Sequence, residues 1–151
     1  MLWFVHADSR LDRDAGAAIR RAAAEGARWG CMSVSIDSRD PRLWLVAGAM
    51  NLRARLTGAC SGDMGIWATR ALYEEVGGFA PLAAFEDLVF ADRARRIASC
   101  RVLPVPIVTS ARRWEQAGTG RTIAWMWALR LAYRVGVPPA RLARLYRPDH
   151  R

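Results

Sequence analysis

The chain has 151 residues, of which 52% are hydrophobic, so it can bury a core and is not of the intrinsically disordered class. The formal net charge is +9, and the basic residues are all arginines dispersed along the chain. Because nucleic-acid-binding surfaces are usually clustered basic stripes with interleaved aromatic residues, we do not expect a nucleic-acid partner. An anionic nucleotide sugar or a membrane surface fits this charge better.

Neither secretion nor membrane insertion is indicated by the apolar segments. The segment Leu2–Val5 is too short for the hydrophobic region of a signal peptide, and Thr122–Leu129 is too short to span a bilayer. We therefore expect a cytoplasmic protein. Three cysteines, Cys31, Cys60 and Cys100, are widely spaced and include no C-x-x-C pair, which predicts reduced thiols rather than a zinc site or a disulfide framework.

Strands and helices alternate along the first half of the chain. The run Leu2–His6 is continuously apolar, which is typical of a strand buried on both faces of a sheet. Apolar and polar residues alternate over Trp29–Asp37, as in a half-exposed strand. Capping and stop signals place a helix after each of these strands, one from Asp12 or Asp14 to about Gly26 and one opened by Asp40 and Pro41.

The second half begins with a loop and ends with helices. Gly58–Gly65 is rich in small residues and predicts a loop. The predicted elements that follow are a strand Ile66–Ala68, a helix Arg70–Val76 stopped by Gly77 and Gly78, a helix Glu86–Ala98, strands Arg101–Val105 and Ile107–Ser110, and helices Thr122–Val135 and Pro139–Tyr146. This mixed order, without a repeat or linker, predicts a single α/β domain over residues 1–151.

Polar residues at the end of the first predicted strand are the first candidates for chemistry. His6 and Asp8 follow the apolar run, and ligands of open α/β sheets bind beyond the carboxyl ends of the strands. A carboxylate at this place can hold a divalent cation, which in turn holds a diphosphate. The alternative is that Asp8 or Ser9 only begins the turn into the next helix.

Two adjacent carboxylates, Glu86 and Asp87, begin a predicted helix. Because neighbouring side chains on a helix point in different directions, one of them can cap the helix while the other faces a pocket. A carboxylate beside a bound acceptor hydroxyl can act as a general base. The alternative is that both carboxylates only cap the helix and complement its dipole.

The loop after the second predicted helix is a candidate for ligand contact. Small residues up to Gly62, followed by Asp63, let a loop approach a ligand closely, although they also suit an ordinary turn.

A further candidate is the pair Arg113 and Trp114, which follows a predicted strand. Arginine can clamp a phosphate with two hydrogen bonds, and tryptophan offers a flat face to a sugar or a base. The alternative is a surface arginine beside a tryptophan that packs on the core.

In their order and spacing, these segments resemble one protein family. The segments are His6-Ala7-Asp8-Ser9, Asn51-Leu52-Arg53 through Thr57-Gly58, Gly62-Asp63, Leu72 through Gly77-Gly78-Phe79, Phe85-Glu86-Asp87, Arg112-Arg113-Trp114-Glu115 and the closing stretch Arg121–Tyr146. The chain resembles family 2 glycosyltransferases of the GT-A type, and in particular the arsenosugar-biosynthesis and radical-SAM/selenodomain-associated transferases. The resemblance covers nearly the whole chain.

The resemblance implies an inverting transfer of a sugar from a nucleotide-diphosphate donor to an acceptor hydroxyl. Asp87 would be the base that deprotonates the acceptor, and Glu86 would shape the acceptor site. Asp8 would bind Mg²⁺ or Mn²⁺ at the diphosphate, with His6 in place of the first carboxylate of the family's metal motif. The other residues that would contact donor or acceptor are Gly62, Asp63, Arg113 and Trp114.

Relative to that family, the strand, loop and helix that bind the nucleobase and ribose would precede Met1. The resemblance therefore implies a truncated GT-A fold, a mixed sheet flanked by helices, that corresponds to the C-terminal two-thirds of the domain. Leu2–His6 would then lie at a sheet edge, and we expect activity to require an N-terminal partner chain or segment. A competing interpretation is a non-catalytic basic module, peripheral at the inner membrane face, based on the tryptophan-rich helix Ile123–Tyr133 with arginine at both ends.

Overall fold

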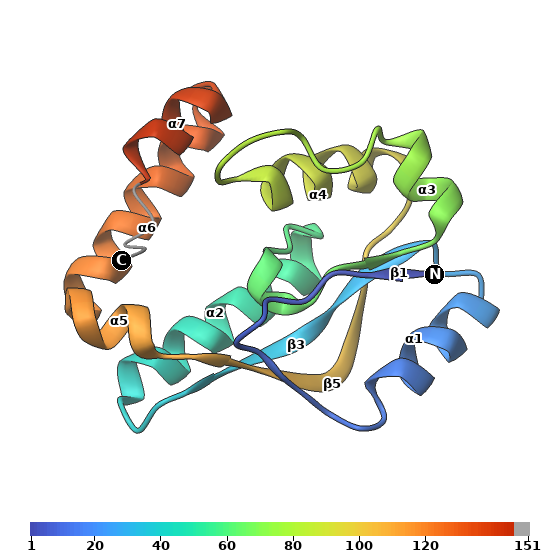
Figure 1. Cartoon of the computed structure of the whole chain (residues 1–151), viewed down its shortest axis with the longest axis horizontal. Helices are drawn as coiled ribbons and strands as arrows, with labels where there is room; N and C mark the ends of the chain where they lie inside the picture. Colours follow the sequence, from blue (N-terminus) through green and yellow to red (C-terminus); the bar gives the residue numbers. More distant parts are fainter. Residues whose placement is uncertain (147–151) are drawn as a thin grey trace.

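The computed structural model describes residues 1–146, except for the side chain of Arg113, and it contains a mixed sheet flanked by helices (Figure 1). The strands over these residues are β1 (Leu2–Trp3), β2 (Arg10–Leu11), β3 (Trp29–Asp37), β4 (Trp67–Ala68) and β5 (Arg101–Ser110). The helices are α1 (Ala15–Ala24), α2 (Pro41–Thr57), the 3₁₀ turn η1 (Gly62–Met64), α3 (Arg70–Glu75), α4 (Glu86–Ile97), α5 (Arg112–Ala117), α6 (Thr119–Arg134) and α7 (Pro139–Leu145). The predicted α/β architecture is confirmed.

The strands of this part of the chain lie in the order β1-β4-β3-β5-β2. The long central strands β3 and β5 are parallel, and the other pairs are antiparallel. Helix α1 lies on one side of β3 and β5, whereas α2, α4 and α6 lie on the other (Figure 1). The candidate site residues belong to that second side or to the loops next to it.

Strand β3 shows the alternation that its sequence predicts. Met32, Val34 and Ile36 are buried, whereas Ser35 and Asp37 are exposed. Because successive side chains of a strand point to opposite faces, the second half of β3 has one face against the core and the other open, whereas Trp29–Met32 are buried on both faces.

The prediction of a strand buried on both faces over Leu2–His6 is wrong. Strand β1 covers only Leu2–Trp3, and its residues are half-buried. Its partner β4 has two residues, so the antiparallel ladder can extend little further, and one more backbone hydrogen bond runs from Phe4 to Ile66. The expected edge position is confirmed, because β1 is the outer strand on its side of the sheet.

The two strands predicted over Arg101–Val105 and Ile107–Ser110 form one continuous strand, β5. Proline lacks the N–H that a ladder needs, which is why the segment around Pro106 seemed to interrupt the strand. The register with β3 shifts between Met32 and Ser33, which pair with Leu103 and Pro106. Pro104 and Val105 have no partner in this register, and the bulge that they form lets the strand continue past its prolines.

Helix α2 is fixed at both ends and along its length. Asp40 accepts a hydrogen bond from the N–H of Arg42, and Gly58 adopts a left-handed conformation at the end of the helix, as expected for these residue types. In the middle, the Asn51 amide accepts a 2.8 Å hydrogen bond from the N–H of Val34 and donates one of 2.9 Å to its carbonyl. Along β3, strand β4 pairs with Trp29 and Gly30, and the Asn51 amide forms the hydrogen bonds to the backbone further along the same edge.

Three elements were not predicted. Strand β2 consists of two exposed residues that pair with β5 where a turn was expected. Helix α5 follows β5 directly, and η1 lies inside the predicted loop Gly58–Gly65. All three are short, so their sequences carry too few residues for a periodic signal, and contacts with longer elements decide their conformation.

A second, smaller core lies between the start of α4 and the pair α6–α7, apart from the main core around the sheet. Its buried members are Ala84, Phe85, Leu88, Leu129 and Leu142. Phe85 has a positive φ of 69°, which is unusual for a bulky side chain, and it packs against Tyr146 with ring centroids 5.7 Å apart. This core therefore holds α6 and α7 against the residues just before Glu86. Among the described residues, no helix combines the length and the apolar character needed to cross a bilayer.

Candidate active site

A pocket of about 500 Å³ lies between α2, α4, α5 and α6, with the loop after α2 at one side. Its apolar lining includes Met50, Leu88 and Met126. Its polar lining is dominated by charge and aromatic rings, namely Arg53, Arg130, Arg134, Asp63, Asp92, Trp114, Trp127 and Tyr133. The volume and the mixture of apolar walls with a few polar groups are typical of a small-molecule site.

Asp87 lies in the first turn of α4, and backbone groups hold both of its carboxylate oxygens. The N–H of Gly62 donates a hydrogen bond of 2.6 Å to Oδ2, and the N–H of Leu88 donates one of 2.8 Å to Oδ1. The carboxylate thus bridges α4 and η1 in a fixed orientation. Each oxygen keeps lone-pair capacity, so the group can still accept a proton from a bound hydroxyl.

His6 and Gly62 lie next to this carboxylate. A Cβ added to Gly62 would come 2.6 Å from Nε2 of His6 and 3.5 Å from Oδ2 of Asp87. A side chain at position 62 would therefore displace the exposed imidazole of His6. The structure thus brings together His6, Gly62 and Asp87, three of the residues predicted for the site.

Glu86 precedes Asp87 and is half-buried. Burial raises the pKa of its carboxyl, the negative charge of Asp87 adds to this effect, and His6 acts in the opposite direction. Glu86 is therefore within electrostatic reach of both residues, and its carboxyl binds a proton more readily than an exposed glutamate does.

Two arginines of the pocket, Arg53 on α2 and Arg130 on α6, were not predicted as site residues. Both are half-buried, and burial lowers the pKa of Arg53 to about 10 and also lowers the pKa of Arg130. The positive charge of Arg130 lowers the Arg53 value further, whereas Asp87 opposes the shift in both arginines. The signal that could have found Arg53 is its position on the apolar stripe of α2, three residues after the buried Met50.

Asp63 and Trp114 both line the pocket, as the resemblance implied for ligand-binding residues. Asp63 is half-buried and acts electrostatically on Arg130 across the pocket. Trp114, on α5, is half-buried and also packs against the main core, so the pocket contact and the predicted structural alternative coexist. Arg113 lies in α5, but its side chain falls outside the described part of the structure.

Asp8, the predicted metal ligand, lies in an exposed turn between β1 and β2. The turn is closed by a hydrogen bond from the N–H of Ser9 to the carbonyl of His6, as the structural alternative expects. Within residues 1–146, Asp8 does not belong to a group of three histidine, cysteine or acidic donors that lie within 4.8 Å of one another. A cation held by Asp8 and His6 would therefore need most of its ligands from the diphosphate.

One wall of the pocket is tied to the next by a side-chain hydrogen bond. The hydroxyl of Tyr133, on α6, donates a bond of 2.6 Å to Asp92 on α4. Burial raises the pKa of Tyr133, and the bond to Asp92 raises it further, so the phenol stays protonated and remains a donor. Asp92 also forms an ion pair of 2.8 Å with Arg95, one turn further along α4.

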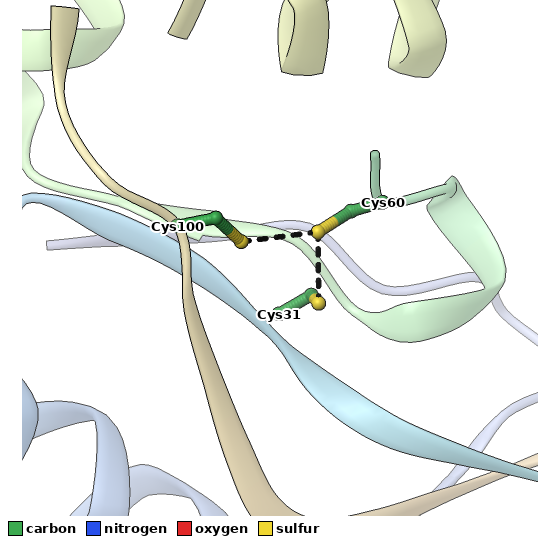
Figure 2. Close-up of side chains that lie close together, drawn as sticks. All are labelled: Cys31, Cys60 and Cys100. Carbon is green, nitrogen blue, oxygen red and sulfur yellow. Dashed lines mark hydrogen bonds between the residues drawn. The ribbon is translucent and has the colours of Figure 1, made fainter. Parts of the chain in front are cut away.

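The three cysteines meet beside this pocket, and Cys60 is part of its lining (Figure 2). Their wide sequence spacing gave no indication of this convergence. The three thiols are free, in agreement with the prediction of reduced cysteines. Hydrogen bonds from the thiols of Cys31 and Cys60 lower the pKa of Cys100 to about 5. The same interactions, together with burial, raise the pKa of Cys31 and Cys60.

No family model, curated protein or solved structure matches the chain. In the site, a proton acceptor held by two backbone N–H groups stands beside a pocket with half-buried positive charge.

Proposed function

We propose that the chain provides the acceptor and diphosphate side of a GT-A-type glycosyltransferase, with Asp87 as the base that deprotonates the acceptor hydroxyl. The observation that carries this proposal is the position of Asp87, bonded to Gly62 and Leu88 and within electrostatic range of Arg53 and Arg130 in the pocket. The resemblance to family 2 glycosyltransferases supplies the reaction class.

The pocket has the charge that a nucleotide-diphosphate sugar requires. Arg53 and Arg130 are half-buried cations, and a diphosphate that enters the pocket would replace part of the hydration that burial removes from them. Trp114 and Trp127 line the same pocket and offer flat apolar faces against which a sugar ring can pack. In this proposal, Asp63 in the pocket lining and Glu86 beside Asp87 accept hydrogen bonds from sugar or acceptor hydroxyls.

In the proposed reaction, Asp87 takes the proton from the acceptor hydroxyl as its oxygen forms a bond to the anomeric carbon. The bond between that carbon and the diphosphate oxygen breaks on the opposite face, so the configuration is inverted. Arg53 and Arg130 stabilise the negative charge that develops on the leaving diphosphate. Because two N–H groups hold the carboxylate of Asp87, little reorganisation is needed when the acceptor binds.

A divalent cation would add to this charge stabilisation. Asp8 and His6 would hold it, since carboxylate oxygen suits Mg²⁺ and Mn²⁺ and imidazole suits Mn²⁺ better than Mg²⁺. Both side chains are exposed and lie at the end of the first strand segment, so they are free to approach a diphosphate. When bound, the cation would neutralise charge on the diphosphate.

Calorimetric titration of the purified chain with UDP and with GDP, each with and without Mn²⁺, tests the diphosphate site. We expect binding that is stronger with Mn²⁺, weakened in Asp8→Ala only when Mn²⁺ is present, and weakened in Arg130→Gln under both conditions. Arg39→Gln, at an exposed position outside the pocket lining, is the matched control and should bind as the wild type does. No heat of binding at millimolar nucleotide in the wild-type chain would remove the proposal.

A second candidate function is contact with an anionic membrane surface. Trp127, Leu131 and Val135 lie four residues apart along and just beyond α6, and they are 64%, 64% and 72% exposed. Such a stripe, beside exposed arginines on a chain of net charge +9, suits an interfacial helix. Co-sedimentation with vesicles of anionic lipid tests this candidate: Trp127→Ser should lower the bound fraction, and a wild-type chain that stays in the supernatant would exclude it.

A further inference from the structure

Three cysteines from distant parts of the sequence place their sulfur atoms together. Cys31 comes from β3, Cys60 from the loop after α2, and Cys100 from the residue just before β5 (Figure 2). The Sγ of Cys60 lies 2.9 Å from that of Cys31 and 3.3 Å from that of Cys100, and the three sulfurs all lie within 4.8 Å of one another. These separations exceed the roughly 2.05 Å of a disulfide bond, and all three thiols are free.

The cluster is shielded from solvent but borders the pocket. Cys31 and Cys60 are 0% exposed, and Cys100 is half-buried. Cys60 belongs to the pocket lining and Cys100 is only half-buried, so small side-chain movements would let an ion reach the sulfurs without unfolding.

The half-buried guanidinium of Arg53 lies beside the loop that carries Cys60. The Nε of Arg53 donates a 2.9 Å hydrogen bond to the carbonyl of Ala59, the residue before Cys60. One terminal nitrogen of the guanidinium, Nη2, is buried and has no hydrogen-bond partner among the described residues. A buried donor without a partner is costly, so a negative charge on the nearby thiols would stabilise this nitrogen.

We propose that Cys31, Cys60 and Cys100 form a three-thiolate site for one soft metal ion, and that Cu(I) is the ion that fits it. Binding releases the protons of the thiols as sulfur–copper bonds form, with no change in oxidation state. The three thiolates with one Cu(I) carry a net negative charge, which the guanidinium of Arg53 offsets.

The number and type of ligands favour Cu(I) over zinc. Thiolate ligands suit Cu(I), zinc and iron–sulfur clusters, but a structural zinc site is almost always four-coordinate, so the number of ligands decides against zinc here. In the described part of the chain, no fourth histidine, cysteine or acidic donor joins the three sulfurs. Metal–sulfur bonds of about 2.3 Å in a trigonal arrangement place the sulfurs about 4.0 Å apart. The sulfurs of Cys60 and Cys31, which are 2.9 Å apart, would therefore separate by about 1 Å around the ion.

The test uses the full chain, reduced and kept free of oxygen, and the probe is Cu(I) in competition with a chromogenic Cu(I) chelator. We expect one Cu(I) per chain and only sulfur neighbours, three in number, in X-ray absorption spectra. Cys100→Ser should weaken binding by more than about 100-fold, because even the outer partners of metal ligands are worth about 10–100-fold. Arg53→Met should weaken it by about 10-fold through the lost charge.

Two controls keep the result independent of folding and of glycosyl transfer. Ser99→Ala, an exposed neighbour of Cys100, should bind as the wild type does. Cys100→Ala, checked by circular dichroism, shows whether a folded chain without this thiol still binds. Three outcomes would overturn the proposal. The wild-type chain could fail to compete with the chelator, a folded Cys100 variant could bind Cu(I) as the wild type does, or the spectra could show oxygen or nitrogen neighbours. Nucleotide binding is measured separately, so either proposal can fail alone.

Discussion

The backbone N–H of Gly62 donates a hydrogen bond of 2.6 Å to Oδ2 of Asp87, which joins the loop after α2 to the first turn of α4. Because a Cβ on Gly62 would meet His6, the same contact brings the end of the N-terminal segment to this carboxylate. Three segments that are far apart in the sequence are therefore held at one point, and this point is where we place the base of the proposed reaction.

Replacement of Asp87 by asparagine should abolish transfer without unfolding the chain. The amide can accept a hydrogen bond from only one of the N–H groups of Gly62 and Leu88, so we expect a stability loss of about 1–2 kcal/mol. Loss of the base should lower whatever turnover the wild-type chain shows, alone or with an N-terminal partner, by at least about 100-fold, measured as nucleotide release from a sugar donor. Asp14→Asn is the control, because Asp14 is exposed and makes no side-chain cap bond. Turnover retained in the Asp87 variant would rule out its role as the base.

Asn51 should matter for stability more than its half-buried position suggests. Asn51→Leu would leave both the N–H and the carbonyl of Val34 without their partner, and we expect a loss of about 2–4 kcal/mol in the free energy of unfolding, measured by urea denaturation. Leu52→Ala, an exposed position on the same helix, should change stability by less than about 0.5 kcal/mol. Equal effects of the two substitutions would show that the bonds to Val34 carry no weight.

At position 85, glycine should be more stable than alanine. Both substitutions remove the buried ring that packs on Tyr146, but alanine keeps the cost of the left-handed conformation at φ 69°, whereas glycine does not. Glycine is also the better residue of the two before a helix. The free energy of unfolding, measured by thermal denaturation, should be roughly 1 kcal/mol higher for Phe85→Gly than for Phe85→Ala. Ala83 is the control, because its φ is not positive, and Ala83→Gly should destabilise the chain. If glycine were more stable than alanine at both positions, this account would be contradicted.

Stability should depend on pH through Glu86. Its folded-state pKa is raised, chiefly by burial, so its contribution to stability is full below the unfolded value and is lost as pH rises through the folded value. Glu86→Gln cannot ionise and escapes that loss. The variant should therefore gain stability relative to the wild type when pH is raised from 4 to 7, measured by denaturation at both values. A difference between the two proteins that does not change with pH would show that burial of Glu86 has no such effect.

Local sequence signals determined much of the secondary structure. The alternation over the second half of β3 determined which of its side chains are buried, and Asp40, Pro41 and Gly58 determined where α2 begins and ends. These features depend on residues within a few positions of one another, where backbone preference and periodicity act directly. The acidic pair Glu86 and Asp87 was likewise recognisable at the start of a helix.

Only the tertiary structure decided which side chains meet. Arg53 and Arg130 share the pocket with Asp63, although 77 positions separate the arginines in the sequence (130 − 53), and Cys31, Cys60 and Cys100 converge from three different segments. The continuity of β5 past Pro106 likewise depends on the register shift in β3. The physical reason is the same in each case: contacts between distant segments are set by how helices and strands pack, and no residue's local conformational preference encodes its partner in another element.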